Sequence, residues 1–198
     1  MNLVNKISTT LLVIAALASV ASAKVKPKLE IHLSKGTMTD PRDGTIYNTV
    51  MIDNQIWMAE NLDYKVGASW CYENNPEKCV VYGRLYNWVT AKSVCPVGWK
   101  LPSDHDWEKL LEILGDDAQH LKSGDMQGTD STGFEALPAG DRNAEGVYDD
   151  IGGYATFWTS TENDSTSAWK SLLSVGDNQL HRGVDQKVSG FSVRCIKE

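Results

Sequence analysis

The most reactive side chains in this 198-residue sequence belong to four cysteines, Cys71, Cys79, Cys95 and Cys195. No two of them have the C-x2-C spacing that zinc sites typically use, so no metal site is expected. An even number of cysteines favours disulfides instead, and three pairings are possible. The segment between Cys71 and Cys79 is polar and rich in turn-forming residues, so it can fold back on itself. This favours Cys71–Cys79 together with Cys95–Cys195.

Groups arranged for hydrolysis are not evident in the sequence. There is no G-x-S-x-G motif, and the four histidines are scattered without ligand spacing. Asp104, Asp106 and Glu108 are expected on the exposed first turn of a helix, where negative charge complements the helix dipole. Paired acids for glycoside cleavage have no support. No catalytic residue is therefore predicted.

Tryptophan is unusually frequent, with seven residues against three phenylalanines. Five tryptophans are expected in the core because they lie in apolar strands, on helix faces or beside Leu101: Trp57, Trp88, Trp99, Trp107 and Trp158. Trp70 and Trp169 have polar neighbours and are expected to be partly exposed. Because an exposed aromatic face can stack on the C–H groups of a sugar ring, these two are candidate ligand-binding residues.

The N-terminus has the pattern of an export signal. Lys6 precedes an apolar run over residues 11–17, and small residues follow as far as Ala23. This pattern predicts a signal peptide over residues 1–23, cleaved between Ala23 and Lys24. The run is shorter than the roughly 20 residues that span a bilayer, so no transmembrane anchor is expected. The mature protein is expected to be secreted, periplasmic or on the cell surface, where disulfides persist.

Charge and composition narrow the choice of partner. Acidic residues outnumber basic ones by 26 to 19, and the net charge is −7. Nucleic-acid binding depends on neutralising phosphates with basic side chains, so no nucleic acid is expected as a partner. The length suits one domain over residues 40–198 with an N-terminal arm over residues 24–39. Nothing in the sequence indicates an oligomeric state.

Two helices are predicted to follow a hairpin and a loop. The alternation in residues 46–58 predicts a β-hairpin, and residues 66–79 are expected to form a loop. Leu85, Trp88, Val89 and Cys95 would share one face of the first helix, which Pro96 ends. Ser103 and Asp106 predict a capping box for the second helix, which Gly115 ends.

The second half of the chain is predicted to be rich in loops and short strands. Residues 116–153 lack apolar periodicity and are expected to be a loop region that carries any binding surface. Strands are expected at 155–159, 168–173, 180–184 and 190–196. In the last strand one face would hold Phe191, Val193 and Cys195, and the other Ser192 and Arg194.

Eight ordered motifs carry a family resemblance: Asp43-Gly44-x-x-Tyr47, Gln55-x-Trp57-Met-Ala-Glu-Asn-Leu62, Ser69-Trp-Cys-Tyr72, Tyr82-Gly-Arg-Leu-Tyr-Asn-Trp88, Cys95-Pro-x-Gly-Trp-x-Leu-Pro102, Trp107-x-x-Leu110, Phe157-Trp-x-Ser-Thr-Glu162 and Gly190-Phe-Ser-Val-Arg-Cys195. With them, residues 40–198 resemble the Fibrobacter succinogenes major paralogous domain. That family is similar to the C-type-lectin-like fold. The resemblance implies an α+β domain with two helices packed on a twisted, loop-rich and mainly antiparallel sheet. It also implies a disulfide between the first helix and the last strand, where Cys95 and Cys195 lie, and it supplies no catalytic residues.

Calcium is the one cofactor that the similarity to the C-type-lectin-like fold suggests. C-type lectins proper bind sugar through calcium with Glu-Pro-Asn or Gln-Pro-Asp and Trp-Asn-Asp motifs, which this sequence lacks. The turn formed by Glu162, Asn163 and Asp164 offers oxygen ligands of the kind Ca²⁺ prefers, but a capped, solvated turn is the favoured interpretation. No cofactor is expected, and these three residues join Trp70 and Trp169 as candidate ligand-binding residues.

The expected function is recognition without catalysis. The sequence predicts an exported, disulfide-bonded binding domain whose ligand is a carbohydrate, such as an envelope polysaccharide, or a protein of the cell envelope. The alternatives are an enzyme of the formylglycine-generating type, a glycoside-hydrolysing enzyme, or a purely structural envelope protein. Formylglycine-generating chemistry needs reactive thiols, and a disulfide sulfur is not a free thiolate.

Overall fold

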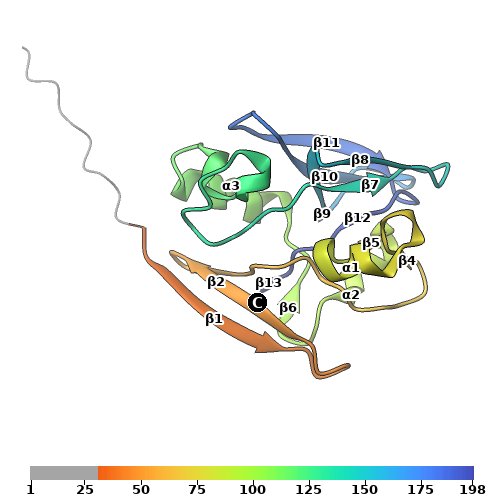
Figure 1. Cartoon of the computed structure of the whole chain (residues 1–198), viewed down its shortest axis with the longest axis horizontal. Helices are drawn as coiled ribbons and strands as arrows, with labels where there is room; N and C mark the ends of the chain where they lie inside the picture. The colour runs from red at the N-terminus through yellow and green to blue at the C-terminus, as the bar shows by residue number, and fades with distance from the viewer. Residues whose placement is uncertain (1–30) are drawn as a thin grey trace, which may run out of the picture.

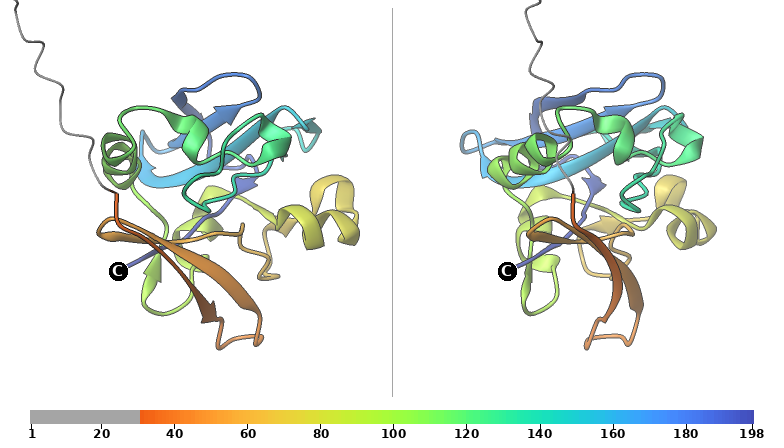
Figure 2. Two further views of the ribbon diagram at one scale, coloured as in Figure 1. Left: turned by 60° about the vertical axis from the view of Figure 1, so that its left-hand side comes forward. Right: turned by 90° about the vertical axis from the view of Figure 1, so that its left-hand side faces the viewer.

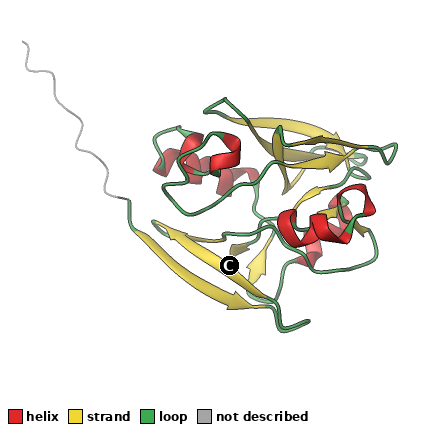
Figure 3. Ribbon diagram, viewed as in Figure 1, coloured by secondary structure: helices red, strands yellow, loops and turns green. Residues whose placement is uncertain are grey.

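The computed structural model describes residues 31–198, which form two β-sheets and three α-helices (Figures 1 and 3). The helices are α1 (Pro76–Tyr82), α2 (Trp88–Val94) and α3 (Asp104–Ile113). The α+β class is confirmed, with one helix more than predicted. The expected signal peptide at 1–23 and the arm residues 24–30 lie outside the described residues.

The first sheet contains the predicted hairpin. Its strand order is β1-β2-β3-β13-β6, and every pairing is antiparallel: β1 (Leu33–Thr39), β2 (Ile46–Ile52), β3 (Gln55–Met58), β13 (Ile196–Lys197) and β6 (Trp99–Lys100). The hairpin turns at Asp53, which has a φ of 56° that Asp tolerates well. Residues 33–39 of the predicted arm form strand β1, which pairs with β2 from end to end. Its side chains are largely exposed, so no apolar alternation marks it in the sequence.

The second sheet holds the remaining predicted strands. Its order is β11-β10-β9-β12-β5-β4, with β7 and β8 attached beside β9: β4 (Ser69–Trp70), β5 (Leu85–Tyr86), β7 (Ala139–Arg142), β8 (Tyr148–Ile151), β9 (Tyr154–Glu162), β10 (Ser167–Ser174), β11 (Leu180–Gln186) and β12 (Phe191–Ser192). Pairing is antiparallel except between β9 and both β7 and β12. Three of the four strands predicted in this region are confirmed.

The fourth predicted strand, residues 190–196, is divided between the sheets. Strand β12 pairs in the second sheet and β13 in the first, so the chain crosses from one to the other. Phe191, Ser192 and Arg194 are all buried along this crossing. The predicted alternation therefore does not separate a buried face from an exposed one, because both sides of the segment are covered.

Helix α3 begins as predicted. The Ser103 Oγ accepts a hydrogen bond from the Asp106 N–H at 3.2 Å, and the Asp106 carboxylate accepts one from the Ser103 N–H at 2.8 Å. Gly115, with a φ of 68°, follows the helix end in the left-handed conformation that commonly closes helices. Asp104 was predicted to be exposed, but it is buried and bonds to Arg182. Asp104 is buried because the first turn of α3 faces β11, which carries Arg182.

The other two helices differ from their predictions. Leu85 lies in β5 instead of a helix, and Val89 is 66% exposed, so the buried face of α2 is formed by Trp88, Ala91 and Val94. Helix α1 occupies part of the segment predicted to be loop, and Cys79 is its one buried residue. A helix without an apolar stripe gives no periodic signal. No helix within residues 31–198 has both the length and the apolar character needed to cross a bilayer.

Two apolar clusters fill the interior. Trp57 and Trp107 meet in the first cluster with ring centroids 4.9 Å apart, and Trp88 and Trp158 belong to the second. These four are buried as predicted, whereas Trp99 is partly exposed because it lies on the short edge strand β6. In Figure 2 the β1–β2 hairpin and strands β9–β11 lie on opposite sides, and α1 and α3 lie at opposite ends.

Candidate binding site at the Cys71–Cys79 disulfide

Both predicted disulfides are present. Cys71–Cys79 has an S–S distance of 2.02 Å and Cys95–Cys195 one of 2.07 Å, and residues 31–198 contain no free cysteine. Cys95 follows the end of α2, and Cys195 immediately precedes β13. The long-range bridge therefore connects a helix to the crossing segment, while the short bridge closes the loop that carries α1.

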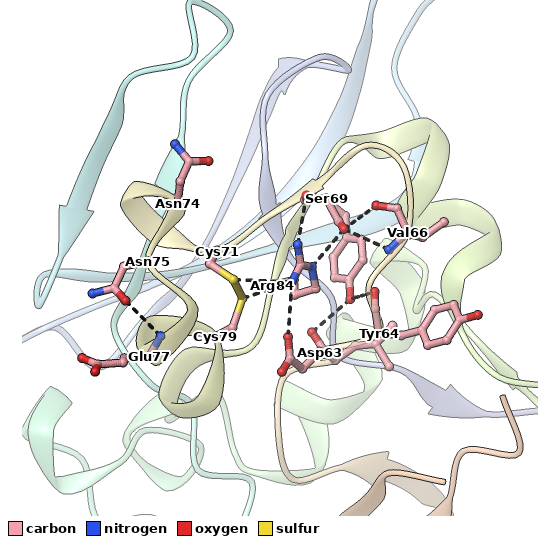
Figure 4. The surroundings of a disulfide bond; sticks show 12 residues. Asp63, Tyr64, Val66, Ser69, Cys71, Asn74, Asn75, Glu77, Cys79 and Arg84 are labelled. Atoms are coloured by element: carbon pink, nitrogen blue, oxygen red, sulfur yellow. Dashed lines mark hydrogen bonds and ion pairs between the residues drawn. A yellow bond between two sulfur atoms is a disulfide. The ribbon is translucent and has the colours of Figure 1, made fainter. Parts of the chain in front are cut away.

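Arg84 is the central charged group beside the short disulfide (Figure 4). Its Nε donates to the Ser69 Oγ at 2.9 Å, and its Nη2 donates to the Ser69 carbonyl at 3.2 Å. Its Nη1 lies 3.4 Å from the Cys71 Sγ and 3.5 Å from the Cys79 Sγ. The preceding residue must be glycine, because a Cβ at position 83 would lie only 2.7 Å from the Asn61 Cβ. The guanidinium group is thus fixed against both sulfurs.

Asp63 is the acidic neighbour of Arg84. Its Oδ1 lies 3.9 Å from the Arg84 Nη1 and accepts no hydrogen bond from the described residues. Burial raises the pKa of Asp63, while the nearby Arg84 charge acts in the opposite direction. The carboxyl group is therefore partly desolvated and has an oxygen without a donor.

A cleft of about 390 Å³ lies next to these groups and is called here the Trp70 cleft. It is lined by charged, amide, aromatic and disulfide groups: Asp63, Lys65, Ser69, Trp70, Cys71, Asn74, Pro76, Cys79 and Arg84. A second cleft of about 420 Å³ shares Asp63 and Cys79 with it and adds the exposed side chains of Val80 and Val81. Helix α1 therefore contributes to both clefts.

Aromatic side chains gather at one side of the Trp70 cleft. Trp70 is partly exposed, and the Arg142 guanidinium carbon lies 4.3 Å from its ring centroid. The Tyr148 ring lies 5.3 Å from the Tyr72 ring, and the Tyr148 hydroxyl donates to the Asn74 Oδ1 at 3.0 Å. The β7–β8 hairpin, which belongs to the region predicted to be loop, therefore packs directly on the residues around the cleft.

Trp169, the other tryptophan proposed from the sequence, lies elsewhere. It is on β10, and three strands separate β10 from the Trp70 strand β4. Its side chain is partly exposed, but the Arg182 guanidinium carbon lies 3.6 Å from its ring centroid. Since Arg182 is bonded to Asp104, this arginine is held over the ring. The two candidate tryptophans thus do not form one site.

The turn at Glu162, Asn163 and Asp164 uses its oxygens internally. The Asp164 Oδ1 accepts hydrogen bonds from the Thr166 N–H and hydroxyl and from the Ser167 N–H, at 2.8–2.9 Å. Hydrogen bonding from the Ser167 side chain, followed by that from Thr166, holds the pKa of Asp164 well below its usual range. Glu162 pairs with Lys187. In residues 31–198 no group of three or more His, Cys, Asp or Glu side chains is arranged to hold a metal ion.

One further acid has a strongly shifted pKa. Burial, reinforced by Asp150, Asp185 and Asp149, raises the pKa of Asp141 to about 6, although Lys170 opposes the shift. Lys170 itself is paired with Asp185 at 2.8 Å. Asp141 is on β7 one residue before Arg142, so it lies near the aromatic side chains but does not line the Trp70 cleft.

The sequence predicted Trp70 but missed the groups around it. Arg84 lies within the motif of residues 82–88, directly before the apolar strand β5, and an arginine in that position is a usable signal for a structural or binding role. No sequence pattern marks the other groups around the cleft, because the residues they contact are distant in the chain: Asp63, Asn74, Arg142 and Tyr148.

These features define an α+β domain with two disulfides and a charged, aromatic-edged cleft beside the shorter one. The chain belongs to the Fibrobacter succinogenes major domain family, whose model matches residues 50–197. The resemblance seen in the motifs is thereby confirmed. Searches against curated proteins and against solved structures found no match.

Proposed function

We propose that this protein is an exported, non-catalytic recognition domain that binds a carbohydrate of the cell envelope in the Trp70 cleft. The observation that carries the proposal is the position of a partly exposed tryptophan at a cleft lined by an acid, a lysine, an amide and an arginine. Sugar ligands need both an aromatic surface and groups that bond hydroxyls. The cleft offers the two together.

The polar groups of the cleft suit hydroxyl recognition. Asp63, whose side chain is 38% exposed, contributes a carboxyl group to the cleft lining, and Asn74 and Lys65 contribute an amide and an ammonium group. Arg84 and Ser69 fix one wall through their hydrogen bonds, so that the site is largely formed before a ligand arrives. Both candidate tryptophans have an arginine over the ring, but Arg182 is fixed over Trp169 by its bond to Asp104, whereas the Arg142 side chain over Trp70 has no acid partner among the described residues. The turn of residues 162–164 is less favoured because its side chains bond to one another and to Lys187.

Export and fold class belong to the same proposal. The N-terminal pattern and the two disulfides both suit an oxidising compartment. A C-type-lectin-like fold is supported by α2 and α3 preceding the long strands β9–β11, and by the bridge from the end of α2 to the segment before β13. Carbohydrate recognition is favoured over an envelope protein as ligand because the cleft is small and combines an aromatic ring with charged and amide groups.

Retention on insoluble cell-envelope polysaccharides, with purified bacterial peptidoglycan as the first probe, tests the proposal. Loss of aromatic stacking at about 1–1.5 kcal/mol predicts that Trp70→Ala weakens retention roughly tenfold, with an unchanged melting temperature. Trp169→Ala is the matched control, since it removes a partly exposed tryptophan of the same sheet outside the cleft. Equal losses for both variants, or a loss for Trp169→Ala alone, would reject the cleft. No retention of the wild type on any polysaccharide would reject a carbohydrate ligand of this kind.

A further inference from the structure

The two disulfides have different surroundings. Cys71 and Cys79 line the Trp70 cleft, and neither belongs to the apolar clusters of the interior. Cys195 is fully buried in the second cluster, and Cys95 packs against the same cluster with partial exposure. One bridge therefore borders a cleft that charged side chains help to line, while the other ends in the apolar core.

The two disulfides also differ in the charged groups beside their sulfur atoms. Thiol–disulfide exchange releases one sulfur as a thiolate, which a neighbouring cation stabilises and an apolar environment disfavours. The Arg84 Nη1 lies within 3.5 Å of both sulfurs of the short bridge, so either leaving thiolate meets the guanidinium group. The Asp63 carboxylate, 3.9 Å from Nη1, offsets part of this charge. Cys195 would leave its thiolate in the apolar cluster.

The structural effect of opening each bridge also differs. Cys71–Cys79 spans 8 residues of sequence, and Cys95–Cys195 spans 100. Cys79 is the one buried residue of α1, so opening the short bridge releases this helix and leaves both apolar clusters complete. Opening the long bridge instead removes the covalent link between the end of α2 and the crossing segment, inside the second apolar cluster.

From these contacts we infer that Cys71–Cys79 is a thiol–disulfide exchange site that thiol reductants open before Cys95–Cys195, with Arg84 stabilising the released thiolate. A reductant thiolate attacks one sulfur, forms a mixed disulfide with it and displaces the other as a thiolate beside Arg84. The second thiol of a dithiol reductant then resolves the mixed disulfide. The protein bridge gains two electrons, the reductant becomes a disulfide, and its two protons balance the two cysteine thiols. This inference does not depend on the identity of the ligand.

Graded reduction with dithiothreitol at pH 7, followed by alkylation and peptide mass spectrometry, tests the inference. Cys71 and Cys79 should be alkylated at least tenfold faster than Cys95 and Cys195. Arg84→Gln should slow opening of the short bridge several-fold, whereas Arg84→Lys, which keeps the charge, should retain most of the rate. Faster or equal opening of Cys95–Cys195, or an Arg84→Gln rate equal to that of the wild type, would overturn it.

A single-thiol variant keeps the test decisive if Arg84→Gln does not fold. Cys79→Ser leaves Cys71 as a lone thiol beside an intact Arg84, and thiolate absorbance near 240 nm reports its titration. The Cys71 thiolate should bind its proton at least tenfold more weakly in the folded protein than in urea, because Arg84 no longer faces the sulfur in the unfolded chain. Equal midpoints would contradict the role assigned to Arg84.

Discussion

Arg194 provides the sharpest test of how this core is stabilised. Its side chain is fully buried on the crossing segment, and its Nε and Nη2 donate to the Asn61 Oδ1 at 3.0 and 2.6 Å. The same group bonds the carbonyls of Phe134 and Glu135. Burial lowers the pKa of Arg194 to about 9, which leaves the guanidinium charged at neutral pH. A cation is thus held in the interior by neutral oxygens.

The perturbation is Arg194→Met, which keeps an unbranched apolar side chain but removes every donor, together with the guanidinium group that lies over the Phe134 ring. The variant would leave the Asn61 Oδ1 and two carbonyls without their arginine donors. Each orphaned buried acceptor costs about 1–3 kcal/mol. Removal of the desolvated charge offsets part of this sum. We therefore expect a net loss of about 2–4 kcal/mol in the free energy of unfolding.

Urea denaturation without reductant measures this loss, with thermal melting as a second assay. For a domain of this size a loss of 2–4 kcal/mol corresponds to a melting temperature lower by about 4–16 °C. Lys197→Met, a change at an exposed position of the neighbouring strand β13, is the control and should alter stability by less than about 0.5 kcal/mol. An Arg194→Met protein as stable as the wild type would refute the reasoning, because the orphaned acceptors would then carry no penalty.

Three further outcomes are expected. Trp107→Ala should destabilise the fold by about 3–5 kcal/mol in urea denaturation, because it empties the centre of the first apolar cluster. Asp141→Asn should raise the free energy of unfolding at pH 7 by about 1–2 kcal/mol and give no gain at pH 4. The pKa of Asp141 is about 6 in the folded protein and 3.8 in the unfolded chain, so the wild type loses stability as the pH rises from 3.8 to 6. Mass spectrometry of the unreduced secreted protein should show a chain that begins at Lys24, and an intact residue 1 would contradict the predicted signal peptide.

Local signals in the sequence predicted the elements that local forces determine. The Ser103 capping box, the turn at Asp53 and the Trp107 stripe each act within a few residues, and all three are confirmed. Strand β1 and helix α1 were missed because partners elsewhere stabilise them. Strand β1 depends on pairing with β2, and α1 depends on the bridge at Cys79.

The candidate site shows the same division. Trp70 was predicted from its polar neighbours, which is a local property. Arg142 lies 72 positions further along the chain (142 − 70) and reaches the ring only because β7 packs beside the second sheet. Arg194 was predicted on the face of a strand opposite Phe191, Val193 and Cys195, and its burial follows from the crossing between two sheets. Neither arrangement leaves a periodic signal in the sequence.

The crossing segment also has a kinetic consequence. Strand β12 lies between β9 and β5, and β13 lies between β3 and β6, so each sheet would divide into two parts without residues 190–197. Ile196 pairs with Trp57, which is 139 positions earlier in the chain (196 − 57). Contacts of such high sequence separation must form against a large loss of chain entropy, and folds dominated by them fold slowly. The last of these contacts to form should therefore limit the folding rate, and fragments that end before residue 190 should remain protease-sensitive because neither sheet is closed.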